Sequence, residues 1–572
     1  MSIQGLNCEH CNFCCVNVRK ILKLLALLTG IVLLLLWGGN LLLHYWLNKQ
    51  LPRILNGSEN RHYDIRYGNF SINWMNRRLL INHITIRPYH ATKDISQDTS
   101  TGVNARIDRF LIQDVSLRKL FLSREISTRL LRIQHPELEL TVLPGEKLVK
   151  DSLQANIFLS DVLKRIRVNN IELQDASLRI LDKRKKEPLL EFGPFELSLL
   201  NVVVDTATLA SPFPFRYGGV ELDGQTVVYR FSPFYTLQIP HLSLKNKTLQ
   251  LDSVVLQPVY SRDDMQRQIR YQQDWYHLTV SRLGAQDVDW GFMAGRLFIR
   301  LKSLDIDTAD FHIYRDKRKP FPPFKKKPLL GSFLRNLPFL LTVDSLKTSG
   351  TNITYEEHPD GPGPAGNVAF DRVSCRISHI SNDTAVLQKY PVCEVEARSS
   401  FLGASPLHAH FRFFLDDLKD RFTVKASLGS LRTSTLNKVL SPLAGMTASG
   451  QIHQLDFTIE GNDISAGNTM RFLYDSLQLS VFEKETRQRS WLLSGVANLF
   501  LHHRNMPGDE GGQQITYRFT RYQNRSYFNY LWNCIKTGAL NTLLNTKHSK
   551  FKKKQLKKFL QKAEEKKTSN KK

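Results

Sequence analysis

Cysteine is the side chain whose spacing comes closest to a chemical site in this 572-residue chain. Four of the seven cysteines lie within the eight residues from Cys8 to Cys15. Thiolates at such spacing are typical ligands of zinc or of an iron–sulfur centre. Metal sites usually draw their ligands from two separated pairs, however, and this cluster is a single short run. We therefore predict a reduced cytoplasmic segment, residues 1–20, without a metal, and keep metal binding as the alternative.

The remaining chemical candidates are weaker. His408 and His410 would point the same way on a strand, beside Arg412, which is the pattern of a polar strand face. The run Gly361 to Gly366 satisfies G-x-G-x-x-G, but its prolines remove backbone donors and no helix follows to bind a phosphate. No P-loop, G-x-S-x-G elbow or H-E-x-x-H motif is present. We expect no catalytic residue, no metal and no cofactor, with an envelope enzyme as the most distant alternative.

The sequence pattern of the elements that would position any site occurs twice in the chain. Residues 63–205 return as residues 235–385, and Arg109-x-x-x-Gln113-Asp114-Val115 returns as Arg282-x-x-x-Gln286-Asp287-Val288. What recurs is mostly apolar residues at spacings of two, as in half-buried strands, with small phase shifts that mark turns or bulges. A duplicated β pattern predicts an elongated stack in which each unit buries its face against the next.

A mainly β fold with few short helices is therefore expected: an elongated, curved, repeat-built antiparallel sheet that forms a groove. A third β region spans residues 390–545, with strands at Leu407–Leu415, Phe422–Leu428, Ile452–Ile459 and Leu477–Phe482. Helices are expected at Thr433–Leu440, Trp491–Leu501 and Tyr527–Leu544. An ordinary closed sandwich or barrel is the alternative.

The N-terminus predicts a membrane anchor. Leu24 to Leu47 is a nearly unbroken apolar run, long enough for one spanning helix within residues 21–47, with Tyr45 and Trp46 at its end. A cleaved signal peptide is the alternative, but no Ala-x-Ala-like site follows. A weak excess of cations before the run places the N-terminus in the cytoplasm and the bulk of the chain outside.

The formal charge of +26 favours anionic partners. The tail, residues 546–572, holds a large share of it, and an exported, anchored body makes lipid headgroups a better partner than nucleic acid. The headgroup-binding candidates are Lys552, Lys553, Lys554, Lys557 and Lys558. A disordered, solubilising tail is the alternative.

A single N-terminal span is followed by the strand-rich Tyr63–Pro88 segment and, near the end, by Gly450-x-Ile452-x-x-Leu455-x-Phe457 and Tyr474-x-x-Leu477-x-Leu479. In these segments the chain resembles the AsmA-like family of inner-membrane-anchored envelope proteins, which are related in architecture to TamB and to chorein-type lipid-transfer proteins. It implies an inner (plasma) membrane protein with a periplasmic body that supports phospholipid transport or outer-membrane assembly. It brings no catalytic residues.

The resulting hypothesis is a lipid-binding or lipid-transfer protein whose apolar groove holds acyl chains of membrane phospholipids. The groove-lining candidates are Ile65, Ile72, Ile81, Leu237, Leu244 and Leu251. Anionic lipid and outer-membrane assembly proteins are further expected partners. The alternative function is a membrane-tethered scaffold that regulates outer-membrane protein assembly through its sheet edges.

Overall fold

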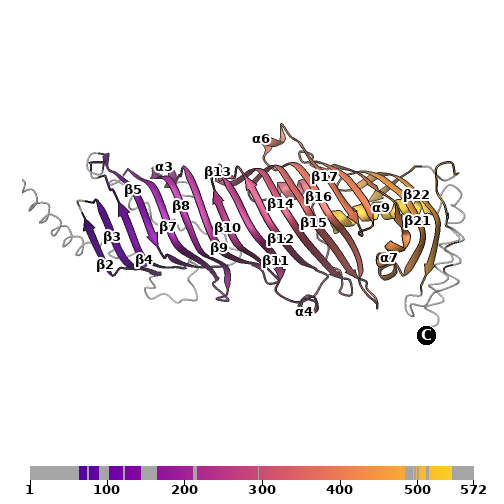
Figure 1. The fold of residues 1–572 in the computed structure, drawn as a ribbon, viewed down its shortest axis with the longest axis horizontal. Helices are drawn as coiled ribbons and strands as arrows, with labels where there is room; N and C mark the ends of the chain where they lie inside the picture. Colours follow the sequence, from indigo (N-terminus) through magenta and orange to yellow (C-terminus); the bar gives the residue numbers. More distant parts are fainter. Residues whose placement is uncertain are drawn as a thin grey trace, which may run out of the picture. The chain divides into compact units, whose positions relative to one another are not determined.

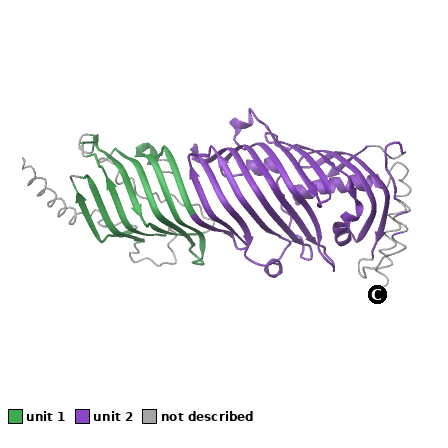
Figure 2. Cartoon of the chain, viewed as in Figure 1, with its two compact units in different colours: residues 1–224 green, residues 225–572 purple. Residues whose placement is uncertain are grey.

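The computed structural model describes residues 63–73, 76–88, 102–116, 118–119, 123–143, 164–209, 215–293, 295–482, 494, 498, 501–509 and 514–543. Within them the protein is mainly β, with long strands in a mixed sheet and few short helices (Figure 1). The chain divides into two compact units, residues 1–224 and 225–572 (Figure 2).

Three segments singled out in the sequence lie outside the described residues: the cysteine-rich segment 1–20, the anchor 21–47 and the basic tail 546–572. In the described part of the chain, no helix has the length and apolar character needed to cross a membrane.

Unit 1 is a sheet of long, mostly antiparallel strands. β3 pairs with β1, β2 and β4, β4 pairs with β5 and β6, and β7 pairs with β8. Its elements are β1 (Tyr63–Arg66), β2 (Asn69–Asn73), β3 (Arg78–Pro88), β4 (Gly102–Gln113), β5 (Glu125–Gln134), β6 (Glu137–Val142), β7 (Arg165–Asp182), β8 (Pro188–Asp205) and α3 (Thr206–Leu209). The boundary between the units falls inside β9 (Gly219–Ser232).

Unit 2 repeats this plan and extends it toward the C-terminus. Its first elements are β10 (Tyr235–Lys245), β11 (Thr248–Pro258), α4 (Arg262–Gln268), β12 (Asp274–Gln286), β13 (Asp289–Met293), β14 (Arg296–Asp316), α5 (Leu330–Arg335), β15 (Leu340–His358) and β16 (Gly366–Ser381). The extension comprises α6 (Thr384–Leu387), β17 (Val392–Phe401), β18 (Ser405–Phe414), β19 (Phe422–Leu428), β20 (Leu431–Arg432), the 3-10 helix η2 (Thr433–Leu436), α7 (Asn437–Ala444), β21 (Met446–Gly461), β22 (Ser465–Val481), β23 (Ile515–Thr520) and α9 (Tyr527–Leu543).

The sheet is mixed, which corrects the prediction of an antiparallel sheet. β7 runs parallel to β5 and β6, and β15 runs parallel to β14. A parallel pair needs a long crossover connection, which residues 317–339, including α5, provide in unit 2; the residues between β6 and β7 lie almost entirely outside the described part of unit 1. The prediction was wrong because side chains alternate in the same way in both kinds of sheet, so apolar spacing does not report strand direction.

The two copies of the repeat share this strand plan, since the parallel pair falls at the same place in each. They also share a rare backbone conformation at equivalent residues. Positive φ angles of 41 to 60° occur at three matched pairs, His83 and Ser253, Asp114 and Asp287, and His135 and Thr308. Non-glycine residues seldom adopt such angles. At Ser253 the buried positions shift phase by one residue, so that Leu251 and Val254 both lie on the apolar face. The duplication therefore preserves a backbone path as well as an apolar pattern.

α9 is the longest described helix and lies against the C-terminal strands of unit 2. It begins after Ser526, whose side-chain oxygen accepts a hydrogen bond from the Asn529 N–H at 3.3 Å, as an N-cap does. Its buried face repeats every four residues, at Tyr530, Cys534, Gly538 and Thr542. The helix packs against β21, β22 and β23 (Figure 1).

Candidate functional site

One face of the unit 1 sheet carries large apolar side chains in register across its strands. The first band is Phe70, Ile81, Phe110, Ile133, Leu173 and Leu197. The second is Ile72, Leu79, Ile112, Leu131, Ile171 and Leu199. Neighbouring strands lie about 4.8 Å apart, so each band is a continuous strip of apolar contacts across the strand direction.

Unit 2 carries the equivalent bands. One runs through Leu242, Leu251, Leu283 and Ile306. The other runs through Leu244, Leu249, Ala285, Leu304, Leu346, Ile377, Val395, Phe411, Val424 and Ile459. We call the surface formed by the bands in each unit its apolar face.

The structure places all six groove candidates in paired apolar positions. Ile72 and Ile81 belong to the bands of unit 1, and Leu244 and Leu251 belong to those of unit 2. Ile65 lies opposite Ile86, and Leu237 lies opposite Leu256. All six are half-buried. The lysine candidates of the tail lie outside the described residues.

Among the described residues, the central part of the apolar face over β10 to β14 is a single layer, while at one end of these strands Met265 of α4 packs against the cluster that includes Leu256. The buried centre of the single layer consists of Ile239, Val254, Val280 and Ala309, which are at most 9% exposed. The partly buried residues packed around them are Val227, Leu237, Leu242, Leu251, Leu278, Leu283 and Ile306. Every member of this cluster comes from a strand of the same sheet. An ordinary two-layer core would include side chains from a second layer.

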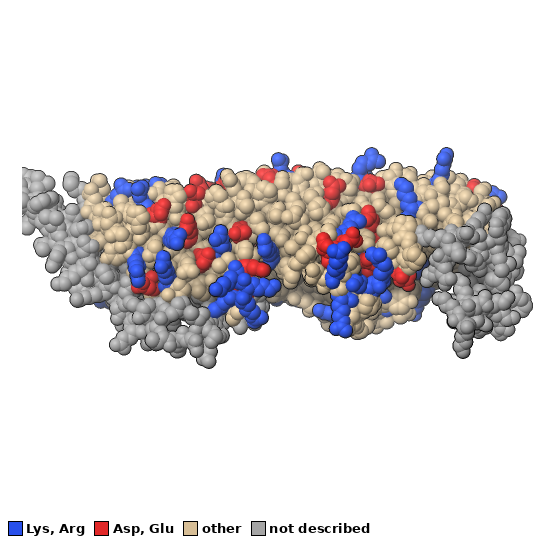
Figure 3. Space-filling model, turned by 90° about the horizontal axis from the view of Figure 1, so that it is seen from below, with Lys and Arg blue, Asp and Glu red and all other residues tan. Residues whose placement is uncertain are grey.

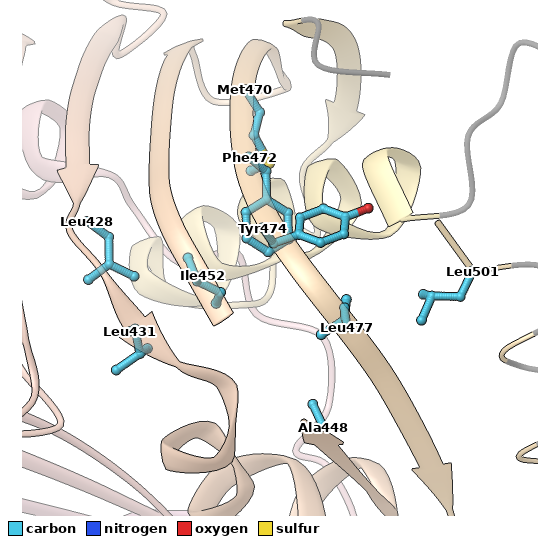
Figure 4. Packing of buried hydrophobic residues seen from close by; sticks show 9 residues of the cluster. All are labelled: Leu428, Leu431, Ala448, Ile452, Met470, Phe472, Tyr474, Leu477 and Leu501. Carbon is cyan, nitrogen blue, oxygen red and sulfur yellow. The ribbon is translucent and has the colours of Figure 1, made fainter. Parts of the chain in front are cut away.

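Toward the C-terminus a helix supplies that second layer. Met470, Phe472 and Tyr474 of β22 belong to a buried cluster that also takes in Ile535 and Ala539 of α9. Figure 4 shows its nine buried side chains, which extend from β19 to β22 and from the segment of Leu501. A second cluster joins Phe422 to Tyr530 and Cys534. Burial raises the pKa of the Cys534 thiol to about 12, which agrees with a dry helix–sheet contact.

The opposite face of unit 2 is polar and holds a groove of about 990 Å³ across β14 to β22. Most of its lining residues are polar and occupy alternate positions of each strand, so their side chains point away from the apolar face, but the lining also includes residues between them, such as Ile306, Ala409 and Phe457. One in-register row of this lining is Asp305, Lys347, Arg376, Glu396, His410 and Lys425. Cations and acids are mixed along it, which is typical of a solvated strand face. Figure 3 likewise shows both signs interleaved on the side of the molecule that it presents.

His408 and His410 point together into this polar groove, as the alternation predicts. His410 lies opposite Glu396, and Arg412 pairs with Glu394 at 3.0 Å. Within the described ranges, no three His, Cys, Asp or Glu side chains lie close enough to hold a metal ion. Cys375, Cys393 and Cys534 are free thiols.

Two features escaped the sequence reasoning. It predicted α9 as a helix but not that this helix covers the apolar face, although the four-residue spacing of Tyr530, Cys534 and Gly538 indicates a buried stripe. It also passed over Leu418 and Ile464, which are exposed apolar residues in turns. In the sequence, each could have been recognised as a single large apolar residue between turn-forming polar residues.

No protein-family model matches the chain, and no curated protein is detectably similar to it.

Proposed function

We propose that this protein is a membrane-anchored, non-enzymatic lipid-binding protein that transfers phospholipids by holding their acyl chains on the apolar face. The observation that carries the proposal is the single-layer cluster over β10 to β14. Large apolar side chains in register make a strip on which a linear hydrocarbon chain can lie across several strands. Each buried methylene contributes about 0.8 kcal/mol, so even partial coverage of an acyl chain gives several kcal/mol.

Further support comes from the rest of the chain. The apolar run 24–47 has the composition of a membrane anchor, and the segments that resemble the AsmA-like family imply a periplasmic body in the cell envelope. The lysine-rich tail has the charge to meet anionic headgroups at about 1 kcal/mol per cation. These features support a role in phospholipid transport and outer-membrane homeostasis.

The first experiment is mass spectrometry of the lipids that co-purify with the full-length protein after extraction in a mild detergent. We expect phospholipid in a defined ratio to protein. The same preparation should move a fluorescent phospholipid from donor to acceptor vesicles. Absence of bound phospholipid, with an outer-membrane assembly protein recovered in its place, would favour the scaffold function and contradict this one.

A matched pair of variants localises the bound lipid. Leu251→Asp puts a carboxylate in the centre of the unit 2 band, between Leu242 and Leu283. Thr248→Asp puts the same charge on the same strand but on the exposed, opposite face, across from Lys245. We expect the first variant to lose most of its bound lipid and the second to keep it. Equal lipid content in the two folded variants would rule out the apolar face as the binding site.

A further inference from the structure

A second surface of unit 2 exposes large apolar side chains on neighbouring turns. Leu418 is 82% exposed, Phe324 71%, Ile464 63% and Tyr522 59%. They stand on four separate segments: the β18–β19 turn, the loop before α5, the β21–β22 turn and the link from β23 to α9. We call these residues the four apolar tips. Solvent-exposed side chains of this size on one edge mark an interaction surface more often than a chance arrangement.

The four segments are bonded to one another. Three backbone hydrogen bonds link them: Asp463 N–H to Lys419 O at 3.0 Å, Arg521 N–H to Ile464 O at 2.8 Å, and Lys327 N–H to Gln523 O at 2.9 Å. The tips therefore belong to one edge of the sheet. This is the edge on which α6 stands, because the N–H of Leu415 donates to Pro391 O at 2.8 Å (Figure 1).

Acidic and basic side chains of this edge differ in exposure and in ion pairing. Two of its acids are turned inward: Asp420 pairs with Arg335, and Asp463 pairs with Arg521, whose side chain has no exposed surface. Lys325 and Lys419 are exposed and form no ion pair with any described residue. Among the described residues of the β18–β19 turn, Asp416 is the one exposed acid outside an ion pair. In the described part of this edge, exposed lysines without an ion pair, Lys325, Lys327 and Lys419, outnumber the exposed acids without one, Asp416 and Glu460, which fits an anionic partner.

Two backbone amides at the tips are hydrogen-bonded within their own turns and so do not need water as a partner. The N–H of Ile464 donates to Asn462 Oδ1 at 2.8 Å, and the N–H of Lys419 donates to Asp417 Oδ1 at 2.8 Å. An unpaired amide would cost free energy on leaving water, and these two amides are satisfied within their own turns.

We propose that the four apolar tips, with Lys325 and Lys419, form a docking edge for the surface of a lipid bilayer that contains anionic headgroups. The apolar side chains enter the interface and the lysines meet the phosphates, which is how amphipathic segments bind a membrane without spanning it. This edge is distinct from the apolar face. The proposal does not depend on the lipid-transfer function, since docking can occur without transfer.

The test is flotation of the full-length protein, held in nanodiscs of phosphatidylcholine, with vesicles of phosphatidylcholine alone or with added phosphatidylglycerol. The test variant is Phe324→Ser combined with Leu418→Ser and Ile464→Ser. The matched control is Phe231→Ser combined with Val259→Ser and Met293→Ser, because these three side chains are also exposed in unit 2 but belong to β9, the β11–α4 link and β13 and not to the four segments of the tips.

We expect the tip variant to bind anionic vesicles about tenfold less than the wild type, and the control to bind like the wild type. Lys325→Ala with Lys419→Ala should remove much of the dependence on phosphatidylglycerol, also by about tenfold. The anchor and the tail are common to all samples, so the comparison isolates the edge. Undiminished flotation of the tip variant would overturn the proposal and leave another protein as the partner of the tips. Phospholipid content measured in the same samples separates this result from failure of the lipid-transfer function.

Discussion

Adding one carbon atom to Gly538 should loosen α9 from the sheet. A Cβ at this residue would lie 2.4 Å from the Tyr517 hydroxyl and 2.7 Å from Sδ of Met470. The methionine is flexible and can move. The tyrosine is fixed, because its hydroxyl donates to Cys534 O at 2.7 Å. Gly538→Ala must therefore shift the helix outward or break this hydrogen bond.

The magnitude follows from three contributions. Overpacking of a well-filled core costs about 1–3 kcal/mol. Loss of the Tyr517 hydrogen bond adds about 1 kcal/mol. Alanine offsets roughly 1 kcal/mol, because it is a better helix former than glycine. The net loss of stability of the helix–sheet contact is therefore about 1–3 kcal/mol.

The assay is alkylation of Cys534, which lies on the sheet-facing side of α9 and is fully buried. Its modification rate, followed by mass spectrometry of the full-length protein, reports how often the helix opens. A loss of about 2 kcal/mol should raise that rate roughly 30-fold. Tyr517→Phe combined with Gly538→Ala should open less often than the two single effects added together, because the phenylalanine lacks the clashing oxygen.

Gly467→Ala is the matched control for this prediction. Gly467 lies in β22 beneath the same region, but its nearest neighbour to a new Cβ is Glu460 O at 4.0 Å. It should leave the alkylation rate unchanged. If Gly538→Ala accelerates alkylation no more than Gly467→Ala does, close approach of the helix to Tyr517 is not what holds α9 in place.

Three further outcomes are expected. Asp463→Asn should lower the stability of unit 2 by about 3–5 kcal/mol in thermal unfolding, because it leaves the buried Arg521 guanidinium uncompensated, and an unchanged Tm would contradict the pairing. The hydrogen bond from Arg421 lowers the pKa of Asp417. The ionised Asp417 therefore stabilises the fold above its unfolded pKa, about 4, and this stabilisation is lost as the pH falls through the lower folded pKa. Asp417→Asn should remove this part of the acid-induced loss in a pH series of Tm values. Burial raises the pKa of Cys393 to about 12, so iodoacetamide should leave it unmodified in the native protein at pH about 9 and modify it after denaturation.

Much of the fold could be predicted from local patterns. The strand expected at Phe422–Leu428 has those bounds, and the helix expected at Tyr527–Leu544 is present as α9 over Tyr527–Leu543, where the described residues stop. Both are runs whose period is strong and whose ends carry turn residues or a cap. The helix expected at Thr433–Leu440 exists as a 3-10 turn followed by α7, and it continues through Pro442 to the left-handed Gly445. The expected helix Trp491–Leu501 lies largely outside the described residues.

The candidate site was predictable in part for the same reason. Alternation identified Leu244 and Leu251 as members of one face, but it carried no information on what covers that face. Covering by α9 depends on contacts such as Gly538 with Tyr517, which join residues from different elements. Strand direction and the grouping of the four apolar tips also depend on long-range pairing, which a local period does not encode.

The left-handed residues of the repeat constrain how the sequence can change. β11 adopts a positive φ at Ser253, and its register with β10 and β12 is the same on both sides of that residue. Substitutions along these strands alter only one contact each. Deletion of Ser253 would instead put the far half of β11 one step out of line with both neighbours, so that inward positions would meet outward ones. An insertion or deletion in one strand is therefore tolerated only when the adjoining strands make the same change. The two copies can therefore diverge by residue replacement, while the number of residues in each strand is constrained by the register with its neighbours.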